Sequence, residues 1–319
     1  MIISVSRRTD IPAFYSKWFM KRIEEGYFYR VNPYNPKQVK RFSLLPKDVD
    51  VIVFWTKNSK NILHYLKKLD KKGYNYIFQY TLNDYPKIFE PNLSNIEKRI
   101  DTFISLSSNI GKEKVIWRYD PIIISDLTPI EYHLEKFKKL SKRLADYTDR
   151  VIISFVDFYG KVENRFKRLQ MANDINIRDM TFYPYRDELI SFAKELKKIA
   201  ENSKLKISKC CGKIDLSLAG IEQSKCIDIE LFNKIFDLNL IYKKDKNQRE
   251  KCLCTESIDL GMYNSCLHGC VYCYANGSEK VVLENHRKHC VDSSILIGAF
   301  DDGGVGDGKG CEEQLKFDV

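Results

Sequence analysis

The chain has 319 residues, 44% of them hydrophobic and 13% aromatic, which is enough to bury a substantial core. It shows neither a signal peptide nor any segment near the roughly 20 apolar residues of a membrane span, so we expect a soluble cytoplasmic protein with no membrane partner. The net charge of +10 is spread along the chain and leaves nucleic acid or another anion open as a partner.

The first 209 residues alternate short apolar runs with amphipathic stretches. Strands are predicted at 2–5, 51–55, 76–82, 115–119, 151–156 and 205–209. Helices are predicted over 59–72, 94–108, 128–147, 188–202 and 229–238. This alternation predicts an α/β fold with parallel strands, a partial or complete (β/α) TIM-like barrel.

Three regions are expected along the chain. Residues 1–209 form the barrel core, and 210–290 form a cysteine-rich, cluster-binding region that closes the barrel. Residues 291–319 form a tail, whose stretch DDGGVGDGKG is rich in glycine and aspartate but does not match a calcium-binding loop.

Polar residues follow several of the predicted strands, where parallel α/β folds place their chemistry. An aspartate there can equally cap a helix, and an arginine and an aspartate two residues apart can form a structural ion pair. We nevertheless expect an active site at these strand ends. The candidate residues are Arg7, Arg8, Asp10, Lys57, Asn58, Arg118 and Asp120.

All ten cysteines lie between Cys210 and Cys311, which in a reducing compartment indicates metal or redox chemistry. Cys266, Cys270 and Cys273 have the spacing C-x3-C-x2-C. They could bind zinc, with a fourth ligand from His268, Cys254 or Cys290. They could instead bind a [4Fe–4S] cluster with one iron left open.

Five further cysteines, which are Cys210, Cys211, Cys226, Cys252 and Cys254, could ligate a second iron–sulfur cluster or a zinc ion. Buried, inert thiols are the alternative. His286 and His289, beside Cys290, could also act as ligands, but we rather expect solvated histidines on a late helix.

The spacing C-x3-C-x2-C with Tyr272 before the last cysteine resembles the signature of radical S-adenosylmethionine enzymes. The longer run YNSCLHGCVYCYA is similar to the spore photoproduct lyase branch of that family. The segments ISVSRRTDIPAFY, FWTKN and WRYDPI, taken with the cysteine motif, resemble a bacterial family known as a domain of unknown function (DUF1848), over about residues 1–290.

The resemblance implies a [4Fe–4S] cluster on Cys266, Cys270 and Cys273, with S-adenosylmethionine bound at the open iron. It implies that Tyr272 lies near the adenine of this cofactor and that a reductant such as flavodoxin or ferredoxin supplies electrons. From the strand ends we add Arg8 and Asn58 as candidates for binding the cofactor. Arg7, Asp10, Lys57, Arg118 and Asp120 would then act on an unknown, anionic substrate.

Two features depart from the radical S-adenosylmethionine family. Its cysteine loop usually opens the chain but here comes late, which a circular permutation of the barrel would explain. Its Gly-Gly-Glu segment has no clear equivalent, because Val305 follows Gly303 and Gly304.

Two other functions remain open. Residues 1–50 contain ten Lys and Arg and nine aromatic residues, which suits a nucleic-acid-binding or repair-associated protein with a structural cluster. A zinc protein with no redox role is the other.

Overall fold

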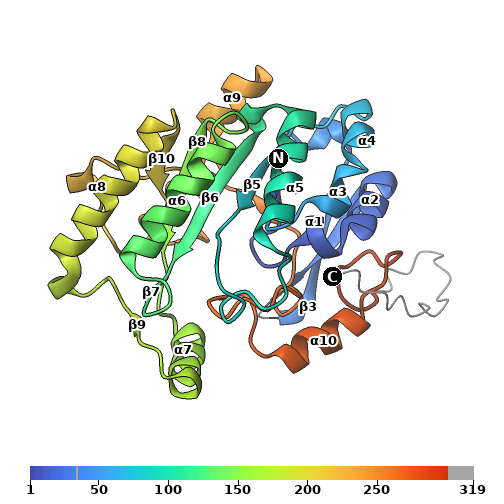
Figure 1. Cartoon of the computed structure of the whole chain (residues 1–319). Coiled ribbons are helices and arrows are strands. Elements are labelled where there is room, and N and C mark those ends of the chain that lie inside the picture. Colours follow the sequence, from blue (N-terminus) through green and yellow to red (C-terminus); the bar gives the residue numbers. More distant parts are fainter. Residues whose placement is uncertain (34, 301–319) are drawn as a thin grey trace.

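A computed structural model describes residues 1–33 and 35–300, and it contains a seven-stranded parallel sheet (Figure 1). The strands are β1 (Ile2–Val5), β4 (Val51–Thr56), β5 (Tyr76–Thr81), β6 (Val115–Ile122), β8 (Arg150–Phe155), β10 (Lys206–Lys209) and β11 (Ile258–Asp259). All six predicted strands are present, and β11 is added to them. The predicted parallel α/β fold is confirmed.

The spatial order of the strands is β10-β8-β6-β5-β4-β1-β11. From β1 to β10 it follows the chain, but β11, which comes last, pairs in parallel with β1 through Ile3 and Ile258. Within the described residues, β10 and β11 are the two edges and do not pair with each other. The sheet is therefore open, and the expected closure of the barrel by residues 210–290 is not seen.

Amphipathic helices cover the outer face of the sheet (Figure 1). The strand residues on this face are apolar and buried, as Phe54, Phe78 and Trp117 illustrate. The main helices here are α2 (Ser16–Glu25), α5 (Ile96–Ile110), α6 (Ile130–Leu144) and α8 (Arg186–Asn202). The apolar sides of these helices and the outer face of the sheet form the largest hydrophobic core. This burial explains why the sequence alternates between apolar strands and amphipathic helices.

Two predicted helices differ in detail. The helix expected over 59–72 is divided into α3 (Lys60–Leu63) and α4 (Leu66–Lys71), although Ile62, Leu66 and Leu69 are still buried together. The helix expected from residue 94 begins at Ile96, and Asn95 caps it with a side chain that accepts from the amide of Lys98. Both helical regions are otherwise where the sequence predicts them.

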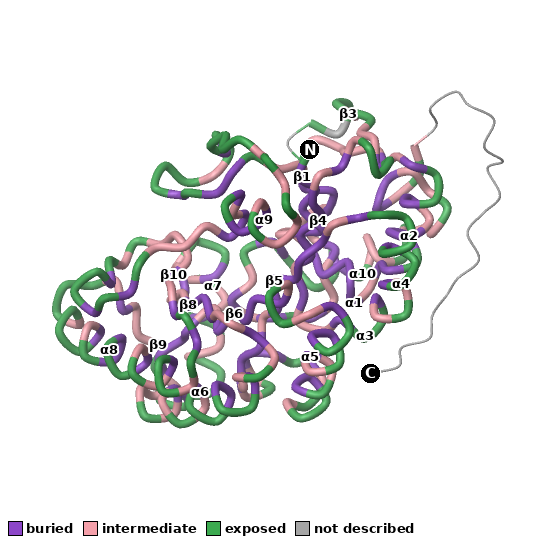
Figure 2. Tube along the Cα trace, turned by 90° about the horizontal axis from the view of Figure 1, so that it is seen from above, coloured by how far each residue is buried: buried purple, intermediate pink, exposed green. Residues whose placement is uncertain are grey.

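The inner face of the sheet changes character along the strands. Towards the amino ends it bears Val51, Ile77 and Ile116, which pack against α9 (Ile229–Phe236). Two residues further along β5 and β6 the same face bears Gln79 and Arg118, because side chains alternate between faces. Figure 2 shows the buried strands running through the centre of the molecule. The inner face is thus apolar at one end and polar at the other.

Several elements were not predicted. They are the antiparallel hairpin of β2 (Tyr27–Asn32) and β3 (Asn35–Ser43), the pair β7 (Ile124–Ser125) and β9 (Ile177–Arg178), and the helix α7 (Gly160–Asn173). The short helix α1 (Ile11–Phe14) begins directly after Asp10, and α10 (Glu279–Arg287) is the late helix expected at His286. Short 3-10 turns lie at Pro46–Asp48, Lys112–Lys114, Tyr183–Tyr185 and Ser217–Ala219. Within 1–33 and 35–300, no helix is long and apolar enough to cross a membrane.

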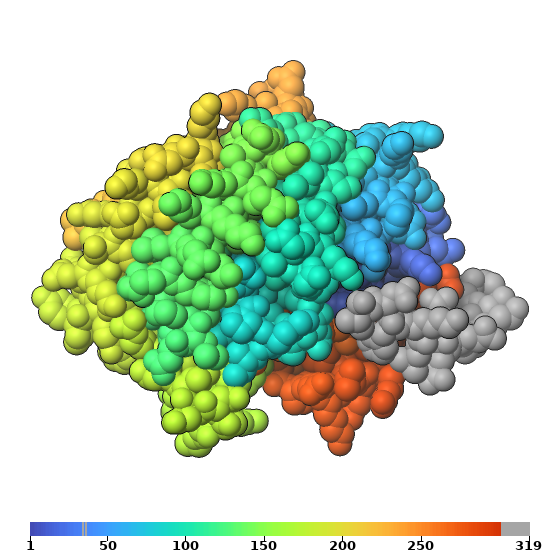
Figure 3. All heavy atoms as spheres, in the orientation of Figure 1, coloured from blue at the N-terminus to red at the C-terminus, as the bar shows by residue number. Residues whose placement is uncertain are grey.

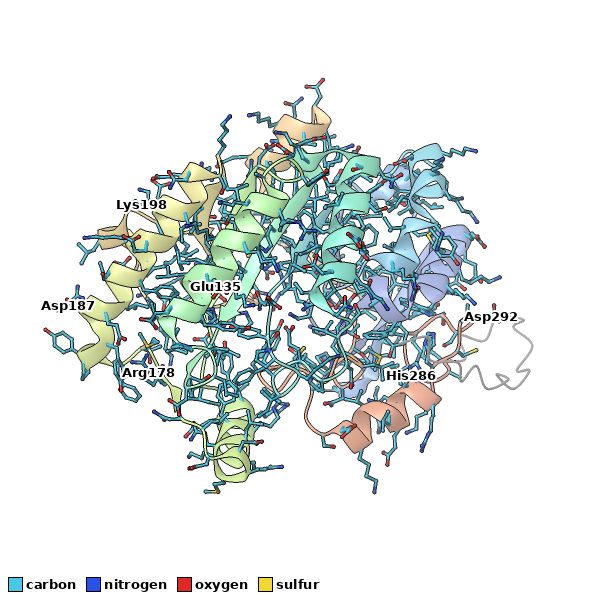
Figure 4. All side chains as sticks on the ribbon, in the orientation of Figure 1. Glu135, Arg178, Asp187, Lys198, His286 and Asp292 are labelled. Atoms are coloured by element: carbon cyan, nitrogen blue, oxygen red, sulfur yellow. The ribbon has the colours of Figure 1, made fainter. Side chains whose placement is uncertain are left out.

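The late part of the chain returns to the first strands. Helix α10 lies at the opposite end of the sheet from α9 (Figure 1). Figure 4 places His286 of α10 and Asp292 on one side of the molecule, far from Asp187 and Lys198 of α8. Residues 301–319 of the expected tail, with Gly303 and Gly304, lie outside the described residues.

Candidate functional site

A cavity of about 450 Å³ opens at the carboxyl ends of β1, β4, β5, β6 and β8. Six predicted residues line it, namely Arg7, Arg8, Asp10, Lys57, Arg118 and Asp120. Eight cysteines line it too: Cys210, Cys211, Cys226, Cys252, Cys254, Cys266, Cys270 and Cys273. The fold therefore brings almost all candidate residues to one site.

Asn58 and the two late histidines are not part of the cavity wall described for this part of the chain. The side-chain oxygen of Asn58 accepts from the amide of Lys60 at the start of α3. His286 and His289 pack against Tyr15, with ring centroids 6.1 and 4.7 Å away, and burial lowers the pKa of both. Both histidines are of intermediate exposure, so they are only partly solvated.

The segment Cys266–Cys273, here called the cysteine loop, follows β11 closely and contacts the first half of the chain at Asn92. Figure 3 shows the late, orange-red part of the chain directly beneath the cyan residues of the first half. Gly269 has φ +68°, a conformation that glycine adopts without strain. A Cβ at this position would lie 3.0 Å from the Asn92 side chain, which donates to the carbonyl of Leu267 at 2.8 Å. Glycine thus permits both the turn and the close approach of this segment.

Side chains also hold the two ends of the cysteine loop. Arg165 donates to the carbonyl oxygens of Cys273 and Asn276, and Asn276 donates to the carbonyl of Cys266 at 2.7 Å. The hydroxyl of Tyr15 donates to the carbonyl of Ser265 at 2.6 Å. The loop is therefore fixed through its backbone, and its thiols are not needed for this purpose.

Asp10 is a buried hub between three elements. Its carboxylate accepts from the amide of Ala13 at 3.0 Å, the hydroxyl of Thr56 at 2.8 Å and the amide of Lys57 at 2.7 Å. It also pairs with Nε2 of His268 at 2.7 Å. It caps α1, as one interpretation of the sequence held, and it also ties the cysteine loop to β4. The geometry favours a positioning role for Asp10.

Glu90 is a second hub, and it was not identified from the sequence. Its carboxylate is buried and bonds Lys57 Nζ at 2.9 Å, Arg99 Nη1 at 3.4 Å and the hydroxyl of Tyr272. Burial alone would raise its pKa, but Lys57 and Arg99 hold that pKa below its ordinary value. The charge of Lys57 is thus already balanced by Glu90, and the same carboxylate anchors Tyr272 of the cysteine loop.

Trp55 on the inner face is flanked by two guanidinium groups. Arg7 lies 5.3 Å and Arg118 lies 5.4 Å from its ring centroid. Arg7 Nη1 is 3.7 Å from Asp245, whereas its Nη2 is buried without a hydrogen-bond partner among the described residues. Arg7 therefore retains donor capacity towards the cavity. Arg8 stacks on Tyr263 at 5.0 Å.

Arg118 and Asp120 form the ion pair that their spacing suggested. Arg118 Nε donates to Asp120 Oδ2 at 2.9 Å, and Arg118 Nη1 donates to Gln79 at 3.2 Å. Burial alone would raise the pKa of Asp120, but Arg118 and the hydroxyl of Ser154 hold it below its usual value. Arg118 Nη1 also lies 3.2 Å from Cys226 Sγ, which joins this pair to a set of cysteines.

That set, here called the second sulfur group, consists of Cys210, Cys226, Cys252 and Cys254. The Sγ atoms of Cys210 and Cys226 are 3.4 Å apart. Cys226, Cys252 and Cys254 belong to one buried cluster on the inner face, and Cys210 packs against it. The four cysteines therefore lie close together, and Cys211 lines the same cavity beside them.

The thiols of both sets are free. Burial raises the pKa of Cys270 to about 12, and burial, with Cys273 and Asp10 nearby, raises that of Cys266 well above its ordinary value. Among residues 1–33 and 35–300, no group of three or more His, Cys, Asp or Glu side chains already has the arrangement of a metal site.

Asp259 was also missed by the sequence analysis, although it attaches β11 to β1. It accepts from the hydroxyl groups of Ser4 and Ser6 and from the amide of Arg7 at 2.8 Å. Since these partners lie more than 250 residues earlier in the chain, no local pattern indicates them.

Comparison with known proteins gives one result for the family. A family model described as a domain of unknown function (DUF1848) matches residues 2–275. No curated protein matches the chain.

Proposed function

The chain belongs to the DUF1848 family, a domain of unknown function, and from its site we propose an iron–sulfur protein that acts as a radical S-adenosylmethionine enzyme. The observation that carries this proposal is the position of the cysteine loop. Cys266, Cys270 and Cys273 line one cavity with Arg7, Lys57 and Arg118 at the carboxyl ends of parallel strands. Such strand ends are where parallel α/β enzymes bind their substrates.

The donor set of the cysteine loop suits a [4Fe–4S] cluster. Three thiolates from Cys266, Cys270 and Cys273 would leave one of the irons without a protein ligand. Zinc in a structural site needs four ligands, and Nε2 of His268, the nearest nitrogen in the motif, is already bonded to Asp10. The Nδ1 atom of His268 is buried without a partner among the described residues, so a zinc site would depend on this one nitrogen for its fourth ligand. We therefore favour the cluster.

The late position of the loop is accounted for by a circular permutation. If β11 is counted first, the sheet order β11-β1-β4-β5-β6-β8-β10 follows the sequence from one edge to the other. The cysteine loop would then follow the first strand, as in the family that its motif resembles. We propose that the fold is a permuted, partial (β/α) barrel whose inner face is covered by α9 and the cysteine-rich segments.

When bound, the cluster and S-adenosylmethionine supply a 5′-deoxyadenosyl radical for hydrogen abstraction from a substrate. The chain's own residues would position the reactants. Arg7 has a free donor and would hold a carboxylate of the cofactor or of an anionic substrate. Lys57 is neutralised by Glu90, so its contribution is to fix Tyr272 and the loop. Asp10 would hold His268 and thereby the orientation of the motif.

The proposal is tested by purification without oxygen, followed by measurement of iron, acid-labile sulfide and zinc. We expect iron and sulfide, and release of 5′-deoxyadenosine after addition of reductant and S-adenosylmethionine. Cys270→Ala should lose both iron and product, whereas Cys211→Ser is the matched control for loss of a thiol in the same cavity. Zinc without iron would overturn the proposal.

A nucleic-acid-binding protein with a structural cluster is the alternative outcome. Iron without cofactor cleavage would favour it, but the β2–β3 hairpin gives it little support. Arg41 lies 4.3 Å from the ring centroid of Tyr27, and Arg30 and Lys40 lie 5.0 and 5.3 Å from that of Phe42. These rings already stack on cations of their own hairpin, so they are less available to bases.

A further inference from the structure

Four cysteines that are far apart in sequence meet beside the inner face of the sheet. Cys210 directly follows β10, Cys226 precedes α9, and Cys252 and Cys254 precede β11. They share one buried cluster, in which the Sγ atoms of Cys210 and Cys226 are 3.4 Å apart. We propose that this second sulfur group holds an iron–sulfur cluster, separate from the one on the cysteine loop.

The backbone of the second sulfur group is held independently of its thiols. The amide of Cys210 donates to the carbonyl of Ile153 at 2.8 Å. The side chain of Gln79 donates to the carbonyl of Cys226 at 2.8 Å. Next to Cys254, the amide of Thr255 donates to the carbonyl of Ile227 at 3.2 Å. The scaffold that brings the sulfurs together is therefore formed without any bond between them.

Inert core thiols are the competing explanation, and the position of the group argues against it. The cysteines do pack on the inner-face core, which includes Ile77, Ile116 and Ile152. All four also line the cavity, so they have an accessible side. Moreover, four thiols gather at one place, with those of Cys210 and Cys226 in direct contact, in a chain that contains 18 Phe and many aliphatic residues to fill a core. Packing alone does not require such convergence.

Positive charge is available to balance thiolates at this position. Arg118 Nη1 lies 3.2 Å from Cys226 Sγ, and Arg7 is an electrostatic neighbour of both Cys254 and Cys226. Four thiolates around a metal centre carry net negative charge that is costly in a buried site unless it is compensated. The two guanidinium groups on either side of Trp55 provide that compensation.

The spacing of the ligands favours a cluster over a single zinc ion. Cys252 and Cys254 are separated by one residue, whereas zinc sites use pairs separated by about two to four residues so that both thiolates reach one ion. A cluster offers separate irons to neighbouring thiolates. Four ligands would leave no iron open, so this centre would transfer electrons or stabilise the fold, without binding S-adenosylmethionine.

The test compares the iron content of anaerobically purified variants. The double variant Cys226→Ser/Cys254→Ser should lose about half of the iron and sulfide of the wild-type protein, because each centre holds about four irons. It should retain the spectral change that S-adenosylmethionine produces at the loop cluster. Cys266→Ala/Cys270→Ala should lose the other half, and Cys211→Ser should keep the full content.

Three results would overturn the inference: full iron in the Cys226→Ser/Cys254→Ser protein, zinc at this position, or a disulfide between Cys210 and Cys226 in the anaerobically purified protein. The outcome is distinguishable from failure of the proposed function. If the loop variant loses no iron while the second variant does, the loop proposal fails and this one stands.

Substitution of buried cysteines can prevent folding, so a measurement on the wild-type protein is needed as well. Stepwise reduction followed by electron paramagnetic resonance should show two distinct signals, of which only one changes when S-adenosylmethionine is added. A single signal, all of which responds to S-adenosylmethionine, would contradict the second centre.

Discussion

The two sets of cysteines at this cavity are built in opposite ways. The cysteine loop supplies its thiols from eight consecutive residues, Cys266–Cys273. The second sulfur group draws on three separate segments between Cys210 and Cys254. The first set can therefore be recognised as a motif, whereas the second exists only because the sheet brings its segments together.

The supports of the two sets differ in the same way. Side chains hold the loop, through Asn92, Arg165 and Asn276. Backbone bonds largely hold the second group, as at Cys210 and Thr255. Substitution of a polar side chain that contacts the loop should therefore disturb the loop and leave the second group intact, and the predictions below use this difference.

The largest effect is expected from Glu90→Gln. It would leave Lys57 and Arg99 buried without their counter-charge, and breaking a buried ion pair in this way costs about 3–5 kcal/mol. Denaturant unfolding should show this loss, and iron should be lost from the cysteine loop because Tyr272 and Lys57 are released. Glu97→Gln removes an exposed carboxylate that pairs with Arg143, and it should leave the unfolding curve unchanged.

The same substitution should alter acid stability. The folded pKa of Glu90 is lowered, so its ionisation stabilises the wild-type protein above the unfolded value of 4.5, and this stabilisation is lost as the pH falls below 4.5 towards the folded pKa. Glu90→Gln should lack that part of the pH dependence. An equally steep acid transition in both proteins would contradict the role given to Glu90.

A smaller effect is expected from Asp10→Asn. The amide can accept from some of the donors around Asp10 but turns its own N–H groups towards the others, and an unsatisfied buried group costs about 1–3 kcal/mol. Iron on the cysteine loop should fall while iron on the second sulfur group is kept. Asp215→Asn, at an exposed turn before Ser217, is the control, and equal loss from both centres would remove the distinction between them.

The contrast between a local motif and a long-range assembly also decides which features of the fold and the site could be predicted from the sequence. The six long strands were found because each is an apolar run, and the three loop cysteines because they form a motif. β11 was missed since Ile258 and Asp259 have no apolar run, and their strand geometry depends on pairing with β1. Glu90 was missed because its partners lie at positions 57, 99 and 272.

The open sheet has a similar cause. Alternation of strands and helices specifies a parallel sheet but does not decide whether its edges meet. Here the inner face is already covered by α9 and by Cys226, Cys252 and Cys254, which pack on Val53 and Ile116. In a closed barrel the strand side chains would fill the interior themselves, whereas here a separate segment packs against them. Because this segment is distant in sequence from the strands, no local sequence pattern predicts the packing.

A third prediction concerns the turn inside the loop. Gly269→Ala would place a Cβ at φ +68° and 3.0 Å from Asn92, and left-handed geometry alone costs about 1–2 kcal/mol for other residues. Unfolding should show a loss of this size, with partial loss of loop iron. Gly160→Ala is the matched control, because no heavy atom lies within 4 Å of the added carbon. Similar behaviour of the two variants would refute the constraint.

The smallest effect is expected from Tyr274→Phe, which removes one hydroxyl from the end of the loop. That hydroxyl donates to the carbonyl of Arg7 at 2.6 Å and is the link between the loop and the β1 end. Since Tyr274 is about half exposed (49%), water can replace the lost bond, and the change in stability should stay near 0.5–1 kcal/mol, about the value of one hydrogen bond.

The informative readout is the affinity for S-adenosylmethionine, because a freed Arg7 backbone would misplace the guanidinium that we assign to the carboxylate of this cofactor. Tyr242→Phe, a partly exposed tyrosine away from the loop, should bind the cofactor as the wild type does. Unchanged cofactor affinity in Tyr274→Phe would mean that Arg7 is positioned by Trp55 and Asp245 alone, and the loop would then contribute cluster ligands without shaping the cofactor site.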